Sequence, residues 1–234
     1  VWIESVNNGY IEDVHYLPDI DRNIIKIKVT SEAKETKFKL DEKEIIIKNN
    51  VYQEITIDNP HLWSPEDPYL YEIKLSNNVD EISSYFAMRK FSKIKIGDYQ
   101  FFALNNKPYF IKGVLDQGYY DKGLLTPEKD EDYIKDISLM KQMGFNTLRK
   151  HIKVESLRYY YHADKLGMIV FQDFINGGHK YGFLTVHAPL FLNVHADDND
   201  YKKFSREDEK NRLDTINEFK EIITYLNNIL YILY

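Results

Sequence analysis

The sequence predicts a chain with two structural parts, a β-sandwich over residues 1–95 and a parallel α/β unit over residues 96–234. In the first part, short runs alternate apolar and polar residues, as half-buried strands do. In the second part, apolar strand-like runs alternate with segments of helical periodicity, which is typical of parallel βαβ units. No apolar run approaches the roughly 18 residues that span a bilayer, so we expect a soluble globular protein that does not bind membranes.

The composition excludes several classes of function. The chain has no cysteine, which excludes disulfide scaffolds, thiolate metal sites and cysteine nucleophiles. Lys and Arg number 31 against 37 Asp and Glu, giving a formal net charge of -6. This balance disfavours a nucleic-acid partner, because phosphate contacts need a basic face. No metal-ligand spacing stands out, and we expect neither a metal nor a cofactor.

Five strands are predicted in the first part. The alternation is clearest in residues 24–29, where Lys26 and Lys28 separate the apolar residues Ile25, Ile27 and Val29. The other four predicted strands cover residues 36–40, 44–48, 52–57 and 70–75. Their spacing of roughly 8–12 residues is typical of a β-sandwich.

The second part is predicted to contain about four βα units. The expected strands cover residues 109–115, 146–151, 168–174 and 229–234. The expected helices begin at Thr126-Pro127 and end at Gly144, run over residues 155–166 and end at Gly167, and open with a capping-box pattern at residues 205–208. Either an open doubly wound sheet or a (β/α)8 barrel fits this pattern, and periodicity does not decide between them. The glycine spacing that binds a dinucleotide is absent after the first strand.

The candidate functional residues follow the predicted parallel strands, because reactive side chains gather at the C-terminal ends of such strands. Asp116 and Gln117 come after the first strand, Arg149 and His151 at the end of the second, and Asp173 after the third. Carboxylate, amide, guanidinium and imidazole groups together suit a ligand rich in hydroxyls. Three structural alternatives stay open: an Arg149–Asp173 ion pair, a loop cap by Asp116, and a hydrogen-bonded core histidine at position 151.

Several motifs, in order along the chain, resemble one known family. Residues 59–71, Asn-Pro-His-Leu-Trp-Ser-Pro-Glu-Asp-Pro-Tyr-Leu-Tyr, and residues 86–90, Phe-Ala-Met-Arg-Lys, resemble the end of the immunoglobulin-like domain of glycoside hydrolase family 2. Residues 107–114 resemble the entry into the family's catalytic barrel, and residues 136–149 and 164–170 are similar to its next elements. The family includes β-galactosidases, β-glucuronidases and β-mannosidases. The resemblance implies an immunoglobulin-like β-sandwich over 1–95 and the N-terminal half of a TIM (β/α)8 barrel over 96–234.

The family resemblance also implies a reaction. The family is known for retaining hydrolysis by two glutamates, one in an Asn-Glu pair after barrel strand four and one after strand seven. Neither has a counterpart in this sequence, so we expect a fragment of a retaining β-glycosidase that is inactive alone, with no catalytic residue of its own. Both ends of the sequence look cut.

Carried over by position, the resemblance assigns substrate contacts. Arg149 matches the family's arginine at the end of strand two, and Asp173 lies where the family has an acidic residue after strand three. The motif Arg149-Lys150-His151 is one residue shorter than the family's usual spacing of Arg and His. The loop at Asp116-Gln117 differs from the His-rich sequence typical of β-galactosidases, so the resemblance does not specify the sugar.

Two kinds of partner are expected. The first is the carbohydrate substrate of the parent enzyme, in a soluble protein of the bacterial cytoplasm. The alternative is a non-catalytic carbohydrate-binding or scaffold protein that self-associates, because a half barrel leaves edge strands with unpaired N–H and C=O groups. In that case a homo-oligomer would form through the exposed barrel edges.

Overall fold

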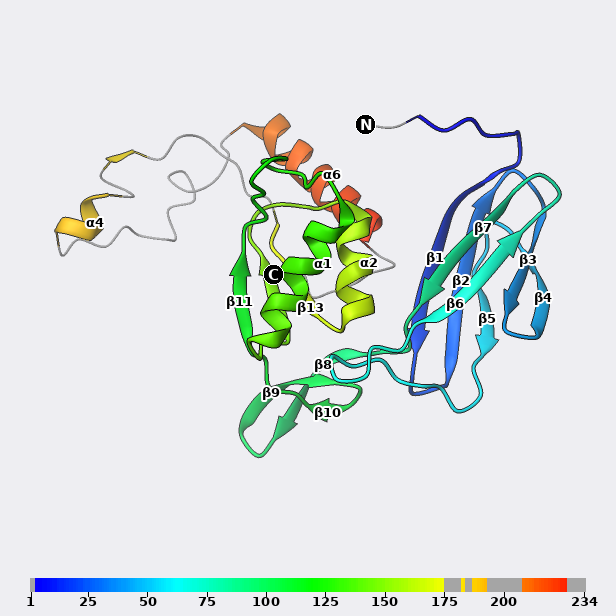
Figure 1. The fold of residues 1–234 in the computed structure, drawn as a ribbon, viewed down its shortest axis with the longest axis horizontal. Helices are drawn as coiled ribbons and strands as arrows, with labels where there is room; N and C mark the ends of the chain where they lie inside the picture. The colour runs from blue at the N-terminus through cyan, green and yellow to red at the C-terminus, as the bar shows by residue number, and fades with distance from the viewer. Residues whose placement is uncertain (1–2, 175–181, 184–186, 193–207, 227–234) are drawn as a thin grey trace. The chain divides into compact units, whose positions relative to one another are not determined.

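The computed structural model of the protein describes residues 3–174, 182–183, 187–192 and 208–226 (Figure 1). The chain falls into two compact units, one containing the residues up to Asp173 and the other Phe174–Tyr225. The expected strand over residues 229–234 lies outside the described residues, as does most of the capping box expected at residues 205–208.

Seven strands in two antiparallel sheets form the sandwich (Figure 1). One sheet has the order β1 (Ile11–Asp19), β2 (Ile24–Ser31), β5 (Gln53–Thr56). The other has the order β4 (Lys43–Lys48), β3 (Glu35–Leu40), β6 (Tyr71–Ser76), β7 (Glu81–Phe86). The five predicted strands are confirmed as β2 to β6, whereas β1 and β7 were not predicted.

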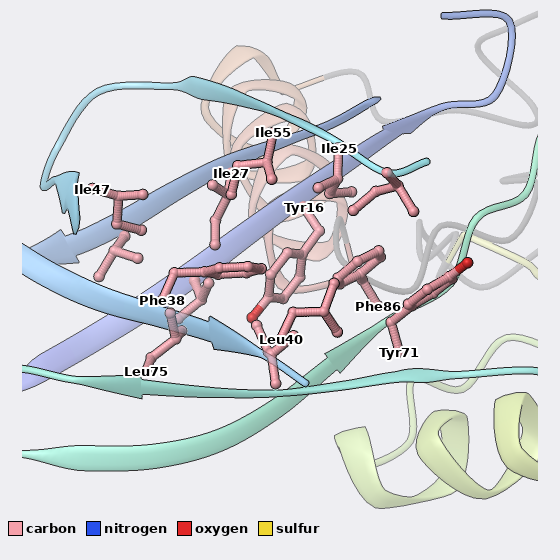
Figure 2. Close-up of a cluster of buried hydrophobic side chains, with 14 of the residues drawn as sticks. Tyr16, Ile25, Ile27, Phe38, Leu40, Ile47, Ile55, Tyr71, Leu75 and Phe86 are labelled. Atoms are coloured by element: carbon pink, nitrogen blue, oxygen red, sulfur yellow. The ribbon is translucent and has the colours of Figure 1, made fainter. Parts of the chain in front are cut away.

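The sandwich core follows from strand alternation. Along β3 the burial alternates at every residue, so that Phe38 points inward between two exposed lysines. Side chains from both sheets meet in one apolar cluster, and Figure 2 shows Ile25, Ile27, Phe38 and Leu75 turned toward one another. All four are fully buried. Apolar burial therefore holds this part of the molecule together.

A small antiparallel sheet follows the sandwich. It consists of β8 (Phe91–Ile96), β9 (Tyr99–Leu104) and β10 (Lys107–Pro108), with a turn at Gly97, whose φ is 61°. The predicted boundary between residues 95 and 96 falls one residue before the end of β8. The ring of Phe102 contacts that of Phe171 edge to face, with centroids 6.0 Å apart, which connects this sheet to the next one.

The predicted parallel βαβ arrangement is confirmed. The strands β11 (Gly113–Asp116), β12 (Thr147–Lys150) and β13 (Ile169–Gln172) pair in that order and run parallel. They are connected by α1 (Asp130–Gln142) and α2 (Leu157–Leu166) (Figure 1). As predicted, α2 ends at Gly167, which has a left-handed φ of 73°.

Two predicted boundaries are wrong. The first helix begins at Asp130 instead of Thr126-Pro127, because Thr126 N–H donates to the Gly123 carbonyl in a tight turn and Lys129 is extended. Three acidic residues in the first turn of α1 favour the observed start, since they face the positive end of the helix dipole. The first parallel strand begins at Gly113 instead of residue 109, because Tyr109 N–H bonds to Phe102 in the preceding sheet.

The second unit contains α4 (Ala188–Phe191) and all but the last residue of α6 (Glu209–Leu226). Phe174 contacts Phe219 of α6 edge to face, at a centroid distance of 4.7 Å. Within the described part of the chain, no helix has both the length and the apolar character required to cross a membrane.

A buried joint connects the sandwich to α2. The Trp63 indole N–H donates to the backbone carbonyl of Asp164 at 2.9 Å. Arg89 holds the Asp164 carboxylate with both terminal nitrogens, at 2.5 and 3.2 Å, and lies 4.7 Å from the centre of the Trp63 ring. Burial raises the pKa of Asp164, and the charge of Arg89 opposes this rise. Because all three side chains are buried, the joint fixes one end of α2.

Candidate functional site

The strand register assigns the candidate residues to the two faces of the parallel sheet. Leu115, Arg149 and Phe171 lie opposite one another on adjacent strands. Asp116, Lys150 and Gln172 form the next row. Neighbouring residues on a strand point to opposite faces, so these two rows face opposite ways. The Arg149 side chain is 53% exposed, whereas that of Lys150 is fully buried, so the first row lies on the open face and the second faces the helices.

Arg149 and Asp173 meet on the open face. The Arg149 Nε–H donates to Asp173 Oδ1 at 2.9 Å, and the Asp173 side chain is almost completely buried. The structural alternative expected from the sequence, an ion pair between these two residues, is therefore present. It anchors the guanidinium at the C-terminal ends of two adjacent strands while leaving half of the side chain exposed.

Gln117 and His151 meet at the same end of the sheet. Gln117 Nε2 lies 3.3 Å from His151 Nδ1, and the His151 backbone N–H donates to the Asp116 carbonyl at 2.9 Å. His151 is half-buried and Gln117 is exposed, so His151 is not a core histidine. The pair offers an amide and an imidazole side by side at the sheet edge.

Asp116 has a different environment. Its Oδ1 accepts the Gly118 backbone N–H at 2.8 Å, and its Oδ2 accepts the Tyr159 hydroxyl at 2.9 Å and lies 3.1 Å from Lys150 Nζ. The loop cap expected as a structural alternative is therefore present. The carboxylate is engaged on the helix side of the sheet, which separates it from the exposed face of Arg149.

Sequence reasoning missed a buried cluster of charges beneath these residues. Lys150 Nζ lies 2.6 Å from Glu155 Oε1 and 4.5 Å from the centre of the Tyr159 ring. Lys153 Nζ contacts the same Glu155 oxygen at 2.8 Å. The signal was available, because alternation along β12 puts Lys150 on the same face as the buried Leu148. A lysine on that face needs an anionic partner, and it has two.

The charge cluster holds the loop that follows β11. Lys153 Nζ donates to the backbone carbonyls of Gly118 and Leu125, at 2.7 and 2.5 Å. Gly118 has a φ of 64°, and a Cβ there would lie 2.4 Å from both Glu155 Oε1 and Lys150 Nζ. Burial, together with the carboxylates of Glu155 and Asp116, raises the pKa of Tyr120 in this loop. A side chain at position 118 would therefore meet both an unfavourable φ and the charged ends of Lys150 and Glu155.

A cavity of about 320 Å³ lies between this loop, β11 and α1. Its walls are mixed, with Val114, Leu148 and Met140 on the apolar side and Gln117, Tyr120 and Asp136 on the polar side. Within the described ranges, no group of three His, Asp or Glu side chains is arranged to hold a metal ion.

Two family models match the chain. Residues 19–89 match glycosyl hydrolases family 2, and residues 94–223 match the TIM barrel domain of the same family. Curated relatives include the β-galactosidase of Halalkalibacterium halodurans, 24% identical over 201 residues, which cover 74% of this chain and 19% of that protein. The β-galactosidase of Lactococcus lactis is 30% identical over 189 residues, which cover 73% of this chain and 18% of that protein.

Solved structures show the same fold. A β-D-glucuronidase of Dictyoglomus thermophilum superposes with a TM-score of 0.71 at 21% identity, over 96% of this chain and 37% of that one. A β-galacturonidase of Eisenbergiella tayi gives a TM-score of 0.68 at 15% identity, over 95% of this chain and 39% of that one. The predicted fold class, an immunoglobulin-like β-sandwich followed by a partial TIM barrel, is confirmed. The chain spans about a fifth of the length of the two curated relatives and belongs to glycosyl hydrolase family 2.

Proposed function

We propose that this chain supplies the sandwich and the first βα units of a retaining β-glycosidase. The observation that carries the proposal is the meeting of two polar pairs, Gln117 with His151 and Arg149 with Asp173, at the C-terminal ends of adjacent parallel strands. That end of the sheet is where barrel enzymes bind their substrates. The relatives named β-galactosidase support a glycoside as the substrate class.

The four residues suit contacts with sugar hydroxyls. The ion pair with Asp173 restricts the Arg149 side chain, so less conformational entropy is lost when its exposed part contacts a ligand. Gln117 and His151 present donor and acceptor atoms at hydrogen-bonding distance from each other, which matches two neighbouring hydroxyls. Asp116 acts indirectly, by setting the loop that carries Gln117.

Hydrolysis itself needs residues other than these. Retaining glycosidases use two carboxyl groups about 5 Å apart, one as nucleophile and one as acid and base. Here Asp173 is bound to Arg149, whereas Asp116 and Glu155 are bound to Lys150 on the helix side. We therefore infer that none of the three is the nucleophile or the proton donor, and that the chain alone does not turn over substrate.

An activity assay tests this inference. The purified chain is incubated with the p-nitrophenyl β-glycosides of galactose and glucuronic acid, and release of p-nitrophenol is followed against a β-galactosidase as the positive control. We expect no release above that of buffer. Turnover by the chain would show that its own carboxylates suffice and would refute the inference.

A binding experiment tests the contacts separately. Methyl β-galactoside and methyl β-glucuronide are titrated into ¹⁵N-labelled protein, and we expect amide shifts at Gln117, Arg149 and His151. The Arg149→Ala variant should bind about tenfold more weakly, since a charge-assisted hydrogen bond is lost. Lys122→Ala, an exposed cation in the loop before α1, is the matched control and should bind like the wild type. If both variants bind equally well, Arg149 does not contribute to ligand binding.

A second candidate function has one observation in its favour. Within the described sheet β11 pairs only with β12, and the side chain of Leu115 on its open face is half exposed. An edge strand with an apolar face favours pairing with a second copy of the chain, as in a self-associating carbohydrate-binding protein. Light scattering distinguishes the two candidates, because a monomer at all concentrations would rule out a self-completed barrel.

A further inference from the structure

A separate cleft lies on the outer face of the sandwich sheet β4-β3-β6-β7. Its volume is about 670 Å³, and its walls include Lys39, Glu72, Lys74, Ser83, Tyr85 and Tyr161. None of the residues at the parallel strand ends lines it. Pockets of roughly 300–1,000 Å³ are typical of small-molecule sites, so this cleft has the room for a ligand.

Strand register builds the floor of the cleft. Lys39 of β3 lies opposite Lys74 of β6, which in turn lies opposite Ser83 of β7. In the adjacent row, Glu72 of β6 lies opposite Tyr85 of β7. These side chains point away from the core because their strand neighbours, such as Phe38 and Leu75, point into it. The floor is thus an array of polar side chains, whose positions are set by the backbone hydrogen bonds of the sheet.

Both ammonium groups of the floor are paired, whereas the lining carboxylates of Asp41 and Glu72 form no ion pair with any residue in the described part of the chain. Lys39 Nζ lies 3.5 Å from Glu44 Oε1, and Lys74 Nζ lies 3.9 Å from Glu81 Oε1, so both ammonium groups already have an anionic partner. Glu72 forms no ion pair with any residue in the described ranges, and its carboxylate can accept hydrogen bonds from a ligand. An unpaired carboxylate accepts hydrogen bonds from neighbouring hydroxyl donors, which a neutral sugar supplies in numbers.

An aromatic wall closes one end of the cleft. The ring centroids of Tyr85 on β7 and Tyr161 on α2 are 5.2 Å apart, with an interplanar angle of 59°. The Tyr85 hydroxyl donates to Asp164 Oδ2 at 3.2 Å, which connects the wall to the buried joint with Arg89. The wall is therefore preformed, with Lys165 Nζ 5.5 Å from the centre of the Tyr161 ring, and it offers an aromatic surface beside the polar floor.

We propose that this cleft is a second carbohydrate site, which binds a neutral oligosaccharide without cleaving it. The C–H face of a sugar ring would lie on Tyr161, and vicinal hydroxyls would donate to Glu72. The proposal goes beyond the glycosidase function, because it involves other residues on other elements. It gives the sandwich a binding role of its own.

Amide shifts in ¹⁵N-labelled protein test the proposal, with lactose and cellobiose as probes and glycerol as a polyol that lacks a ring face. We expect both disaccharides, at millimolar concentrations, to shift the amides of Glu72, Ser83, Tyr85 and Tyr161, and glycerol to shift none of them. Shifts at Gln117 or His151 report on the strand-end site and are scored separately. Disaccharide titrations that leave the cleft amides unmoved would overturn the proposal.

Variants give a second readout. Ser83→Trp fills the cleft from an exposed position on β7, and Glu72→Gln removes the acceptor charge, so each should weaken disaccharide binding by about fivefold or more. Thr56→Trp places the same bulky side chain at an exposed position on β5, outside the cleft, and should bind like the wild type. Unchanged binding by Ser83→Trp would also overturn the proposal.

Discussion

The sandwich and the parallel α/β layer are held together by different interactions. In the sandwich, most fully buried side chains are apolar, as at Ile25, Ile27 and Phe38. In the α/β layer, buried charged groups are prominent, and Lys150 and Asp164 are completely covered. Apolar burial stabilises roughly in proportion to the area removed from water, whereas a buried ion is stabilising only while its partner is present.

This difference reflects what each part must do. The sandwich is a scaffold whose two sheets need only exclude water from the space between them. The α/β layer must hold loops at the ends of its strands, and the charges around Lys150 hold the loop from Gly118 to Leu125 by contacts to its backbone. Hydrogen bonds to charged groups are directional, so they fix a loop more sharply than apolar packing does.

The largest expected effect is in the sandwich. Phe38→Ala should lower the free energy of unfolding by about 4 kcal/mol, because it leaves a cavity between the two sheets. Ile46→Ala, at an exposed position on the neighbouring strand β4, should cost less than about 0.5 kcal/mol. Urea unfolding followed by circular dichroism measures both. Similar losses for the two variants would mean that the apolar cluster is not what stabilises the sandwich.

The next effect tests the α/β layer. Lys150→Met keeps most of the side-chain volume but leaves Asp116 and the buried Glu155 without this cation, and it should cost about 3 kcal/mol. Lys122→Met breaks an exposed pair with Glu128 and should cost less than about 1 kcal/mol. Hydrogen exchange should show the Lys150→Met loss in β12 and α2 and leave the sandwich protected. A uniform loss of protection across the chain would show that the sandwich also depends on the charge cluster around Lys150.

The smallest effect isolates the fit of the loop against the charge cluster. Gly118 and Gly97 both have a positive φ, so alanine is strained at either position. A Cβ at Gly97 has no atom within 4 Å, whereas one at Gly118 would collide with Lys150 and Glu155. We expect Gly97→Ala to cost about 1 kcal/mol and Gly118→Ala about 2 kcal/mol, measured by urea unfolding. Equal costs would show that the cluster yields to the extra methyl group.

Sequence patterns predicted the elements whose burial is periodic. Residues 24–29 and 36–40 alternate so regularly that β2 and β3 were placed within two residues of their bounds. The parallel strands were predicted from a second pattern. Continuous apolar runs, such as residues 168–174, follow segments of helical periodicity. The strand β1 was missed because its inward residues are interrupted by charged and polar ones, and its alternation breaks at an irregular register near Ile11.

The candidate site was predicted only in part. The C-terminal ends of the strands were placed correctly, so Gln117 and His151 were chosen and are in contact. The ion cluster was missed because Lys150 and Glu155 are five residues apart with no strand or helix connecting them, and no periodicity brings them together. A pair of this kind depends on how the short loop after β12 folds back, which alternation does not encode.

The joint at Asp164 has a consequence for exchanging parts between relatives. The sandwich contributes Trp63 and Arg89, which lie 101 and 75 residues before their partner Asp164 on α2. A chimera that takes its sandwich from one relative and its barrel from another inherits the two halves of this contact from different parents. A hybrid whose parents differ at any of these three positions leaves a buried donor or charge without its partner and should be less stable than either parent.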